Sequence, residues 1–247
     1  MPKIAGISRA LAAPGASADG TDIQVRVDQF GAQHVRGELL AWMEDATYFK
    51  ACNATWGTGI GMAIQTSFSD TANVLVLLRS GSATKAIIPH YIRLINTVAG
   101  ATTTSSHMGI ILDTGNRYSS GGTDLSAQVV SPRSDSGATT VLDQIRFAAI
   151  TASAVVVKRQ IARFALKTQA APCWAVGDEV LINFLHNEGS QHGLLSGAAA
   201  GSIVKNVGPM MLKGLNHCLL VHMWNPANAT TAPSWEVEMA WWERPFA

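Results

Sequence analysis

The sequence predicts an all-β protein, an antiparallel β-sandwich of the jelly-roll kind behind an extended N-terminal arm. Three observations predict this fold class. Short apolar or alternating segments recur between turn-forming residues, little of the chain has convincing helical spacing, and no internal repeat is visible. No linker divides the chain, so we expect a single β-sandwich domain over residues 21–247.

The expected arm covers residues 1–20, which are rich in Ala, Gly, Ser and Pro. A segment of this composition has little apolar surface with which to fold on its own. It is equally well interpreted as a disordered tail and as an arm that becomes ordered on a neighbouring subunit. In the second case Arg9, Leu11 and Pro14 are the expected contact residues.

The first expected strands follow in chain order. Residues 22–28 alternate cleanly, whereas residues 37–52 combine helical spacing with a strand-like Thr47-Tyr48-Phe49. Residues 73–79 form a continuous apolar run, which is typical of a strand buried on both faces. In the next strand, Pro89 is expected at an edge or a bulge, because proline cannot donate to the ladder. Strands are predicted further along at residues 86–95, 107–113, 140–148 and 218–224. Residues 125–130 are predicted to be short and extended, and residues 176–184 to be a turn that leads into a strand.

Residues 154–167 can be read in two ways. Val155-Val156-Val157 favours a strand, while the spacing of Val157, Ile161 and Phe164 also suits an amphipathic helix. The all-β context favours the strand. Gly115-Asn116 and residues 119–122 have the composition of turns.

The last strand carries the heaviest apolar load. Trp235, Val237, Met239 and Trp241 alternate with Glu236, Glu238, Ala240 and Trp242, so the first set is expected in the core. Residues 218–224 are its expected hairpin partner. Trp242 falls on the face that should meet water. We therefore expect a protein contact there, and rank sugar stacking on Trp242, Trp224 or Tyr118 below it.

Charge is scarce and nearly balanced. Charged residues make up 14% of the chain, against roughly 25% in an average soluble domain, and the net charge is +1. A surface with so little charge is typical of chains covered by neighbouring subunits. Five basic residues and no carboxylate lie between Asp143 and Asp178. A solvated face is the favoured interpretation of this strip, and Arg159 and Arg163 are its candidates for contact with an acidic neighbour or nucleic acid.

No motif in the chain names a reaction. The candidate carboxylate pairs, Asp113 with Asp124 and Asp178 with Glu179, are more simply explained as turn residues, and no G-x-S-x-G elbow is present. The histidine pairs, at positions 186 and 192 and at 217 and 222, lack the spacing and third ligand of a zinc site. The sequence therefore predicts no catalytic residue, no cofactor and no metal.

The setting is expected to be a reducing one. Cys52, Cys173 and Cys218 have no paired spacing, so we expect buried free thiols. No signal peptide and no run of about 20 apolar residues is visible, so neither secretion nor a membrane partner is expected.

Three blocks of the sequence resemble uncharacterised structural proteins of tailed bacteriophages. They are residues 91–95, residues 109–124 and the closing residues 235–244. The resemblance implies a virion component assembled in the host cytoplasm, a jelly-roll decoration or cement protein that binds the major capsid protein and copies of itself, for example as a trimer. It implies no enzyme activity and no specific nucleic acid. A tail or neck protein, and a carbohydrate-binding module for host attachment, remain the alternatives.

Overall fold

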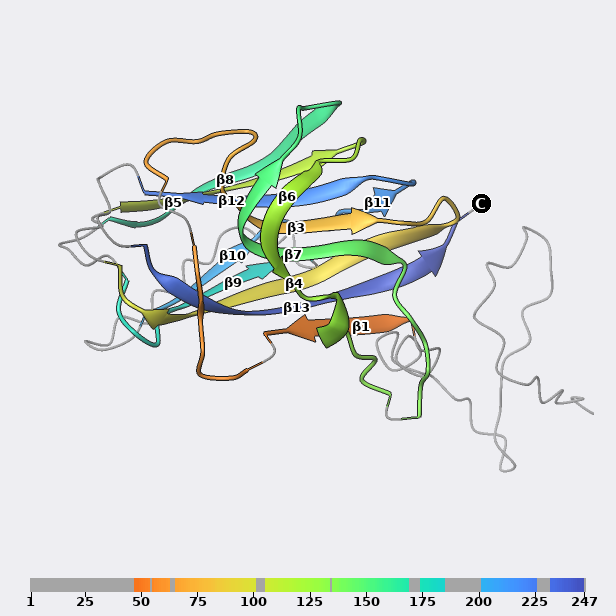
Figure 1. Cartoon of the computed structure of the whole chain (residues 1–247), viewed down its shortest axis with the longest axis horizontal. Coiled ribbons are helices and arrows are strands. Elements are labelled where there is room, and N and C mark those ends of the chain that lie inside the picture. Colours follow the sequence, from red (N-terminus) through yellow and green to blue (C-terminus); the bar gives the residue numbers. More distant parts are fainter. Residues whose placement is uncertain are drawn as a thin grey trace, which may run out of the picture.

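Two β-sheets packed face to face make up the described part of the chain (Figure 1), which confirms the predicted all-β sandwich. The computed structural model describes residues 47–53, 55–62, 65–100, 105–133, 135–168, 174–184, 201–225 and 232–246. Within these ranges the helical content is a single 3-10 turn, η1 (Ser126–Gln128). The predicted arm with Arg9, Leu11 and Pro14, and the strand predicted over residues 22–28, lie outside the described residues.

The first sheet is built around the terminal strand. In spatial order it contains β1 (Tyr48–Cys52), β13 (Ser234–Pro245), β4 (Lys85–Val98), β9 (Glu179–Asn183) and β10 (Ser202–Asn206). The short strands β2 (Ile60–Gly61) and β11 (Leu212–Lys213) pair with β13 and β4. All these pairings are antiparallel except β9 with β10.

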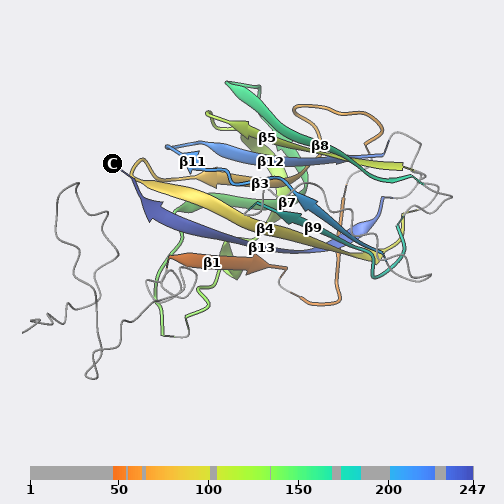
Figure 2. The ribbon, with the colours of Figure 1, turned by 180° about the vertical axis from the view of Figure 1, so that it is seen from behind.

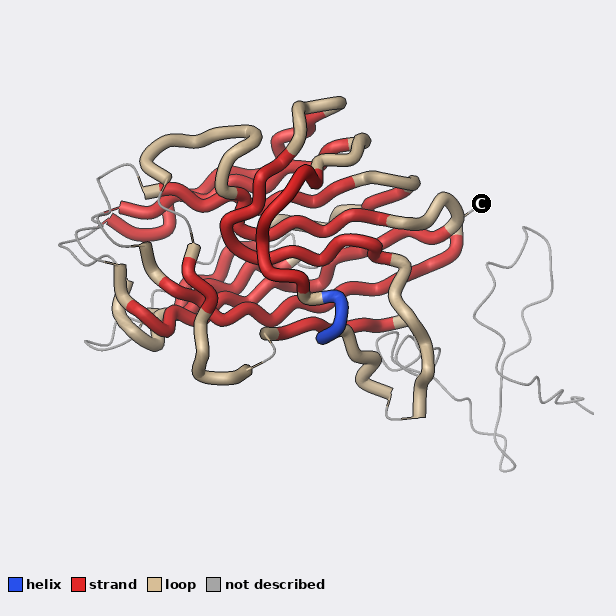
Figure 3. Tube along the Cα trace, viewed as in Figure 1, coloured by secondary structure: helices blue, strands red, loops and turns tan. Residues whose placement is uncertain are grey.

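The second sheet is entirely antiparallel. Its order is β6 (Tyr118–Asp124), β7 (Leu142–Ala152), β3 (Val74–Ser80), β12 (Cys218–Trp224), β5 (Ser105–Asp113) and β8 (Lys158–Thr168). The view from behind in Figure 2 and the tube in Figure 3 show the two sheets as stacked layers. Strand β8 is therefore an end strand, which only β5 borders among the described residues.

The main core lies between the sheets. Trp235, Val237, Met239 and Trp241 all belong to it and are at most 2% exposed, as the period of two in β13 predicts. The facing sheet contributes mostly aliphatic side chains, and a branched apolar side chain suits a pleated, buried surface. The predicted inner face of the terminal strand is thus confirmed.

The hairpin predicted between residues 218–224 and the terminal strand is wrong. Strand β12 pairs with β3 and β5, in the opposite sheet from β13. All seven residues of β12 are buried, so this strand needs cover on both faces and takes a central position. Strand β13 instead carries Glu236 and Glu238 on one face and fits a sheet with an exposed side.

Two local predictions were also wrong. Residues 125–130 contain η1 and no strand, although Val130 makes an isolated bridge to Lys50. Residues 119–122 lie inside β6, not in a turn, and Gly121 and Gly122 have φ of 75° and 72° where the register against β7 shifts. Glycine adopts a positive φ without steric cost, and it does so in β-bulges as well as in turns. The two glycines that had suggested a turn therefore form a bulge within the strand.

The part of residues 154–167 that is regular belongs to strand β8, as the all-β context predicted. Of the other ambiguous segment, Tyr48–Cys52 forms β1, and residues 37–46 lie outside the described residues. Pro89 lies in the middle of the first sheet, at the register shift that pairs Trp241 with Pro89 and Ala240 with Tyr91. It is therefore at a bulge, one of its two predicted places, and the extra residue is His90.

Candidate binding surfaces

Trp242 is buried, so its predicted exposure is wrong. It lies on the outer face of the first sheet, as predicted, but is only 1% exposed. Tyr48 from β1 and His90 from β4 pack against its indole, with ring centroids 5.1 and 4.6 Å away. Tyr48 Oη and His90 Nδ1 are also 2.8 Å apart and hydrogen bond across β13. Neighbouring strands of the same chain thus cover this tryptophan.

The second predicted sugar platform is also buried. Trp224 is 5% exposed and packs against Phe68 and His107, with the Arg163 guanidinium 5.6 Å from its ring. The third, Tyr118, is half-buried and has the Arg146 guanidinium 4.9 Å from its ring centroid.

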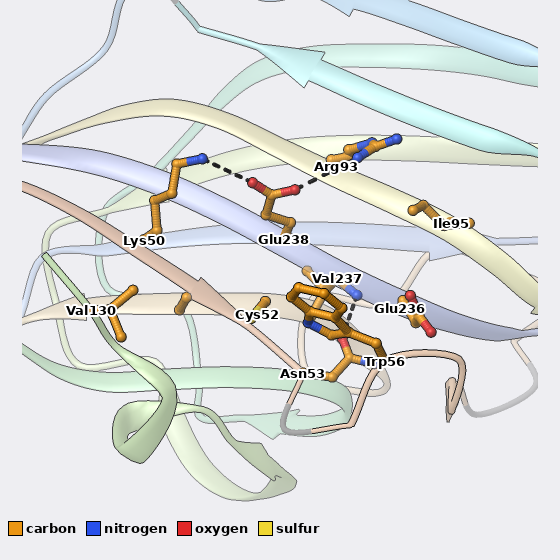
Figure 4. A pocket seen from close by; sticks show the side chains of 11 residues that line it. Lys50, Cys52, Asn53, Trp56, Arg93, Ile95, Val130, Glu236, Val237 and Glu238 are labelled. Carbon is orange, nitrogen blue, oxygen red and sulfur yellow. Dashed lines mark hydrogen bonds and ion pairs between the residues drawn. The ribbon is translucent and has the colours of Figure 1, made fainter. Parts of the chain in front are cut away.

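A groove of about 480 Å³ runs along the outer face of the first sheet at the other end of β13. Figure 4 shows its floor, formed by Lys50, Arg93 and Glu238 from three adjacent strands, with Trp56 standing above one end. Trp56 is 84% exposed. The remaining lining residues are Ala51, Cys52, Asn53, Ile95, Val130, Glu236 and Val237.

The loop that carries Trp56 is fixed at its base by Asn53. The buried Asn53 side chain donates to Thr58 O at 3.1 Å and accepts from Val237 N at 2.6 Å, so it holds both the loop and β13. Gly59 has no room for a side chain, because a Cβ there would lie 1.8 Å from Thr97 Oγ1. Trp56 is therefore presented by a short, anchored loop.

Glu238 organises the floor of the groove. It accepts hydrogen bonds from Tyr91 Oη and from Lys50 Nζ, the latter at 3.1 Å, and lies 3.7 Å from Arg93 Nη1. Burial raises the pKa of Glu238, but these hydrogen bonds and positive charges outweigh it and hold the pKa below its usual value. Arg93 also makes a two-pronged ion pair with Glu179 at 2.8 and 2.9 Å.

A buried ion pair joins three connections at one end of the strands of the second sheet. Both side chains of Asp113 and Arg117 are fully buried, and Arg117 Nη1 lies 2.9 Å from Asp113 Oδ2. Arg117 also donates to Ser153 O at 2.9 Å and to Asp70 O at 2.5 Å. It thereby joins the turn after β5, the connection after β7 and the loop before β3. We call this arrangement the Arg117 node.

The node fixes an exposed apolar segment, the Val155–Val157 ridge. Asp113 accepts from the backbone N of Val156 at 3.2 Å and of Val157 at 2.9 Å. The three side chains are nevertheless 40%, 60% and 51% exposed. In Figure 1 the turns that join β5 to β6 and β7 to β8 extend side by side from the upper edge of the sheet. The ridge is therefore a pre-ordered apolar surface.

Strand β8 continues from this ridge and carries the two predicted basic contact residues. Arg159 and Arg163 are both exposed. Arg159 pairs with Leu112, which faces the main core, whereas Arg163 pairs with Gly109 and lies by Trp224 on the outer face. A register shift at Ile110/Ile111 separates them, so the two arginines point to opposite sides of the end strand.

The remaining candidate groups have structural roles. Asp124 and Asp178 accept backbone hydrogen bonds in turns, as predicted, and His222 is a buried core residue. Burial lowers the pKa of His222 to about 4 and raises that of Cys218 to about 12. Cys52 and Cys218 are free thiols, and Cys218 is buried as predicted, but the predicted burial of Cys52 is wrong because it is half-buried in the groove. Within the described ranges no group of three or more metal-ligating side chains occurs. Cys173 and the histidines at 186 and 192 lie outside those ranges.

The sequence reasoning missed Trp56. Its signal was present, since a tryptophan immediately before Gly57-Thr58-Gly59 stands in a turn and not in a strand. Comparison with models of protein families, with curated proteins and with solved structures finds no match for this chain. In the described part of the chain, no helix is long and apolar enough to cross a bilayer.

Proposed function

We propose that this protein is a structural component of a tailed-bacteriophage particle, a decoration or cement protein that binds the major capsid protein and further copies of itself. The single observation that carries the proposal is the Val155–Val157 ridge. Three consecutive exposed apolar side chains are costly in water, and the Arg117 node holds them in place. A pre-ordered apolar surface loses little conformational entropy on binding, which favours a protein contact.

The neighbourhood of the ridge suits a lateral contact with a folded partner. Ile161 on β8 adds a further exposed apolar side chain, and Arg159 and Arg163 supply charge for an acidic neighbour. Register shifts along β8 and its basic side chains oppose uncontrolled strand addition at this sheet edge. We therefore assign the contact to side chains of the ridge. The sequence resemblance in residues 91–95, 109–124 and 235–244 supplies the particle class.

The first test is self-association of the full chain, measured by sedimentation velocity across a concentration series. The wild type should form oligomers, and Val156→Glu should shift the population towards monomer. Val176→Glu is the matched control, because Val176 is 63% exposed against 60% for Val156 and lies in the turn before β9. Equal oligomerisation of both variants would contradict the role of the ridge.

The second test concerns the particle. Capsids that lack the protein should lose integrity on heating and osmotic shock, and added wild-type protein should restore it. Added Val156→Glu should restore it less well than Val176→Glu. If capsids without the protein resist both treatments as well as complete ones, the cement function is wrong.

A further inference from the structure

Trp56 and the groove below it have no role in the proposed assembly function. Trp56 is the most exposed of the large apolar side chains in the described residues, and Asn53 anchors its loop. The groove volume of about 480 Å³ lies within the roughly 300–1,000 Å³ usual for small-molecule sites. An exposed indole beside a groove of this size indicates a ligand with a flat apolar face.

The charges on the floor of the groove offer no attraction for an anionic ligand. Its charged lining residues are two cations, Lys50 and Arg93, and two carboxylates, Glu236 and Glu238. Lys50 and Arg93 are already paired with Glu238, and Arg93 is also paired with Glu179. The local charge therefore nearly cancels, which gives no electrostatic attraction for a phosphate backbone or another polyanion.

The polar groups of the floor favour a ligand rich in hydroxyls. Donors from lysine and arginine alternate with carboxylate acceptors across adjacent strands, so one ring could both donate and accept hydrogen bonds. The network among them is formed without a ligand, which keeps these groups oriented. An oriented donor and acceptor array discriminates strongly between hydroxyl-bearing and apolar ligands.

One acceptor in the groove lacks a donor. Glu236 Oε1 is a buried atom, and among the described residues no group hydrogen bonds to it. A buried carboxylate oxygen without a partner costs free energy, and a ligand hydroxyl at that position would remove the cost. Glu236 and Glu238 are two residues apart on the same face of β13, so the unsatisfied acceptor lies beside the organised floor.

We propose that this groove is a binding site for a neutral saccharide, with a sugar ring packed on the Trp56 indole and its hydroxyls bound to Glu236 and the charged floor. The C–H face of a pyranose is apolar and slightly positive, which matches the negative face of an aromatic ring. Glu238, held ionised by its hydrogen bonds and positive neighbours, is suited to accept hydrogen bonds from such hydroxyls.

The experiment begins with the full chain on an array of neutral oligosaccharides ending in glucose, galactose, mannose or N-acetylglucosamine, with sialylated and sulfated glycans beside them. The strongest neutral binder is then titrated by calorimetry. We expect Trp56→Ala to weaken binding by about tenfold or more, and Trp56→Phe to recover part of the loss because a smaller ring remains. Glu236→Gln should also weaken binding, since it replaces one carboxylate acceptor by a donor.

The matched control is Val176→Ala, which changes an exposed apolar side chain outside the groove lining and should bind like wild type. Circular dichroism and the unfolding midpoint establish that each variant is folded, as expected for the exposed Trp56. Three results would overturn the proposal: no neutral glycan bound at millimolar concentration, equal binding by Trp56→Ala and wild type, or a preference for the charged glycans. The test is independent of self-association, so the site and the assembly function can fail separately.

Discussion

Replacing Arg117 by Met should be among the most destabilising changes outside the main core. The methionine keeps an apolar stem of similar length but removes the hydrogen bonds to Asp113, Ser153 O and Asp70 O. Breaking a buried ion pair on one side costs about 3–5 kcal/mol, because the remaining charge stays buried without its partner. Since the total stability of a typical domain is about 5–15 kcal/mol, Arg117→Met should lose a large fraction of it.

Equilibrium unfolding in urea measures this cost. Arg133→Met is the control, since Arg133 pairs with Asp135 through side chains that are 43% and 67% exposed, and its midpoint should match that of wild type. The double variant Asp113→Asn with Arg117→Met should lose less than the sum of the two single variants, because it leaves no unpaired buried charge. A loss below about 1 kcal/mol for Arg117→Met, or strict additivity, would refute the reasoning.

Acid provides a second measure of the same node. Burial raises the pKa of Asp113, but hydrogen bonds from Val157, Gly115, Arg117 and Val156 outweigh it, so the pKa in the folded state is below the ordinary value. A lowered carboxyl pKa adds stability above the unfolded pKa, about 3.9, and this stability is lost as the pH falls below it. Unfolding free energies measured from pH 6 to pH 2.5 should therefore fall less steeply in Asp113→Asn than in wild type.

Three further predictions follow from buried or crowded positions. Gly115→Ala should speed proteolysis at the Val155–Val157 ridge, because its Cβ would lie 2.3 Å from Val156 Cγ2; cleavage at the wild-type rate would contradict this. Trp242→Ala should lower the free energy of unfolding by about 3–5 kcal/mol in thermal unfolding, because it empties a buried site. Trp56→Ala changes an exposed residue and should alter stability by less than about 0.5 kcal/mol. Equal losses would be evidence against the buried position of Trp242. His222 has its pKa lowered to about 4, so below about pH 6.5 protons bind the unfolded chain first and stability falls towards pH 4. In His222→Leu this part of the pH dependence should disappear, and an unchanged profile would assign it to another group.

Local periodicity predicted well which face of a strand each side chain lies on, and predicted poorly which strands are neighbours. The alternation in β13 correctly separated Trp235 and Trp241 from Trp242, because a period of two is a property of the strand itself. Whether the outer face is exposed depends on the adjacent strands, and Tyr48 and His90 come from positions far away in the sequence. The same limit explains the wrong hairpin, because the sheet that a strand joins, and the strands it pairs with there, are decided by long-range packing.

The candidate sites were predictable to different degrees. Arg159 and Arg163 were chosen for charge alone, and the register shift that turns them to opposite sides of β8 has no signature in composition. Asp113 and Arg117 both lie within residues 109–124, but no local rule connects Arg117 to Asp70 in the loop before β3 or to Ser153 after β7. The exposure of Trp56 was the easiest of these features to predict, because an aromatic residue in a glycine-rich turn has no strand in which to be buried.

The low charge of the chain predicts contact with neighbouring subunits, and the structure changes which apolar residues can make that contact. In the described part of the chain, two smaller apolar clusters lie outside the main core: one around Leu77 and Leu220, and one around Trp242. Arg117 N hydrogen bonds to Cys218 Sγ of the first cluster at 3.4 Å, so the node lies against that cluster. Part of the apolar surplus is thus buried within the chain and needs no partner. The assembly proposal must depend on apolar surface that remains exposed, which makes a charge at Val156 a sharper test than any change at Trp242.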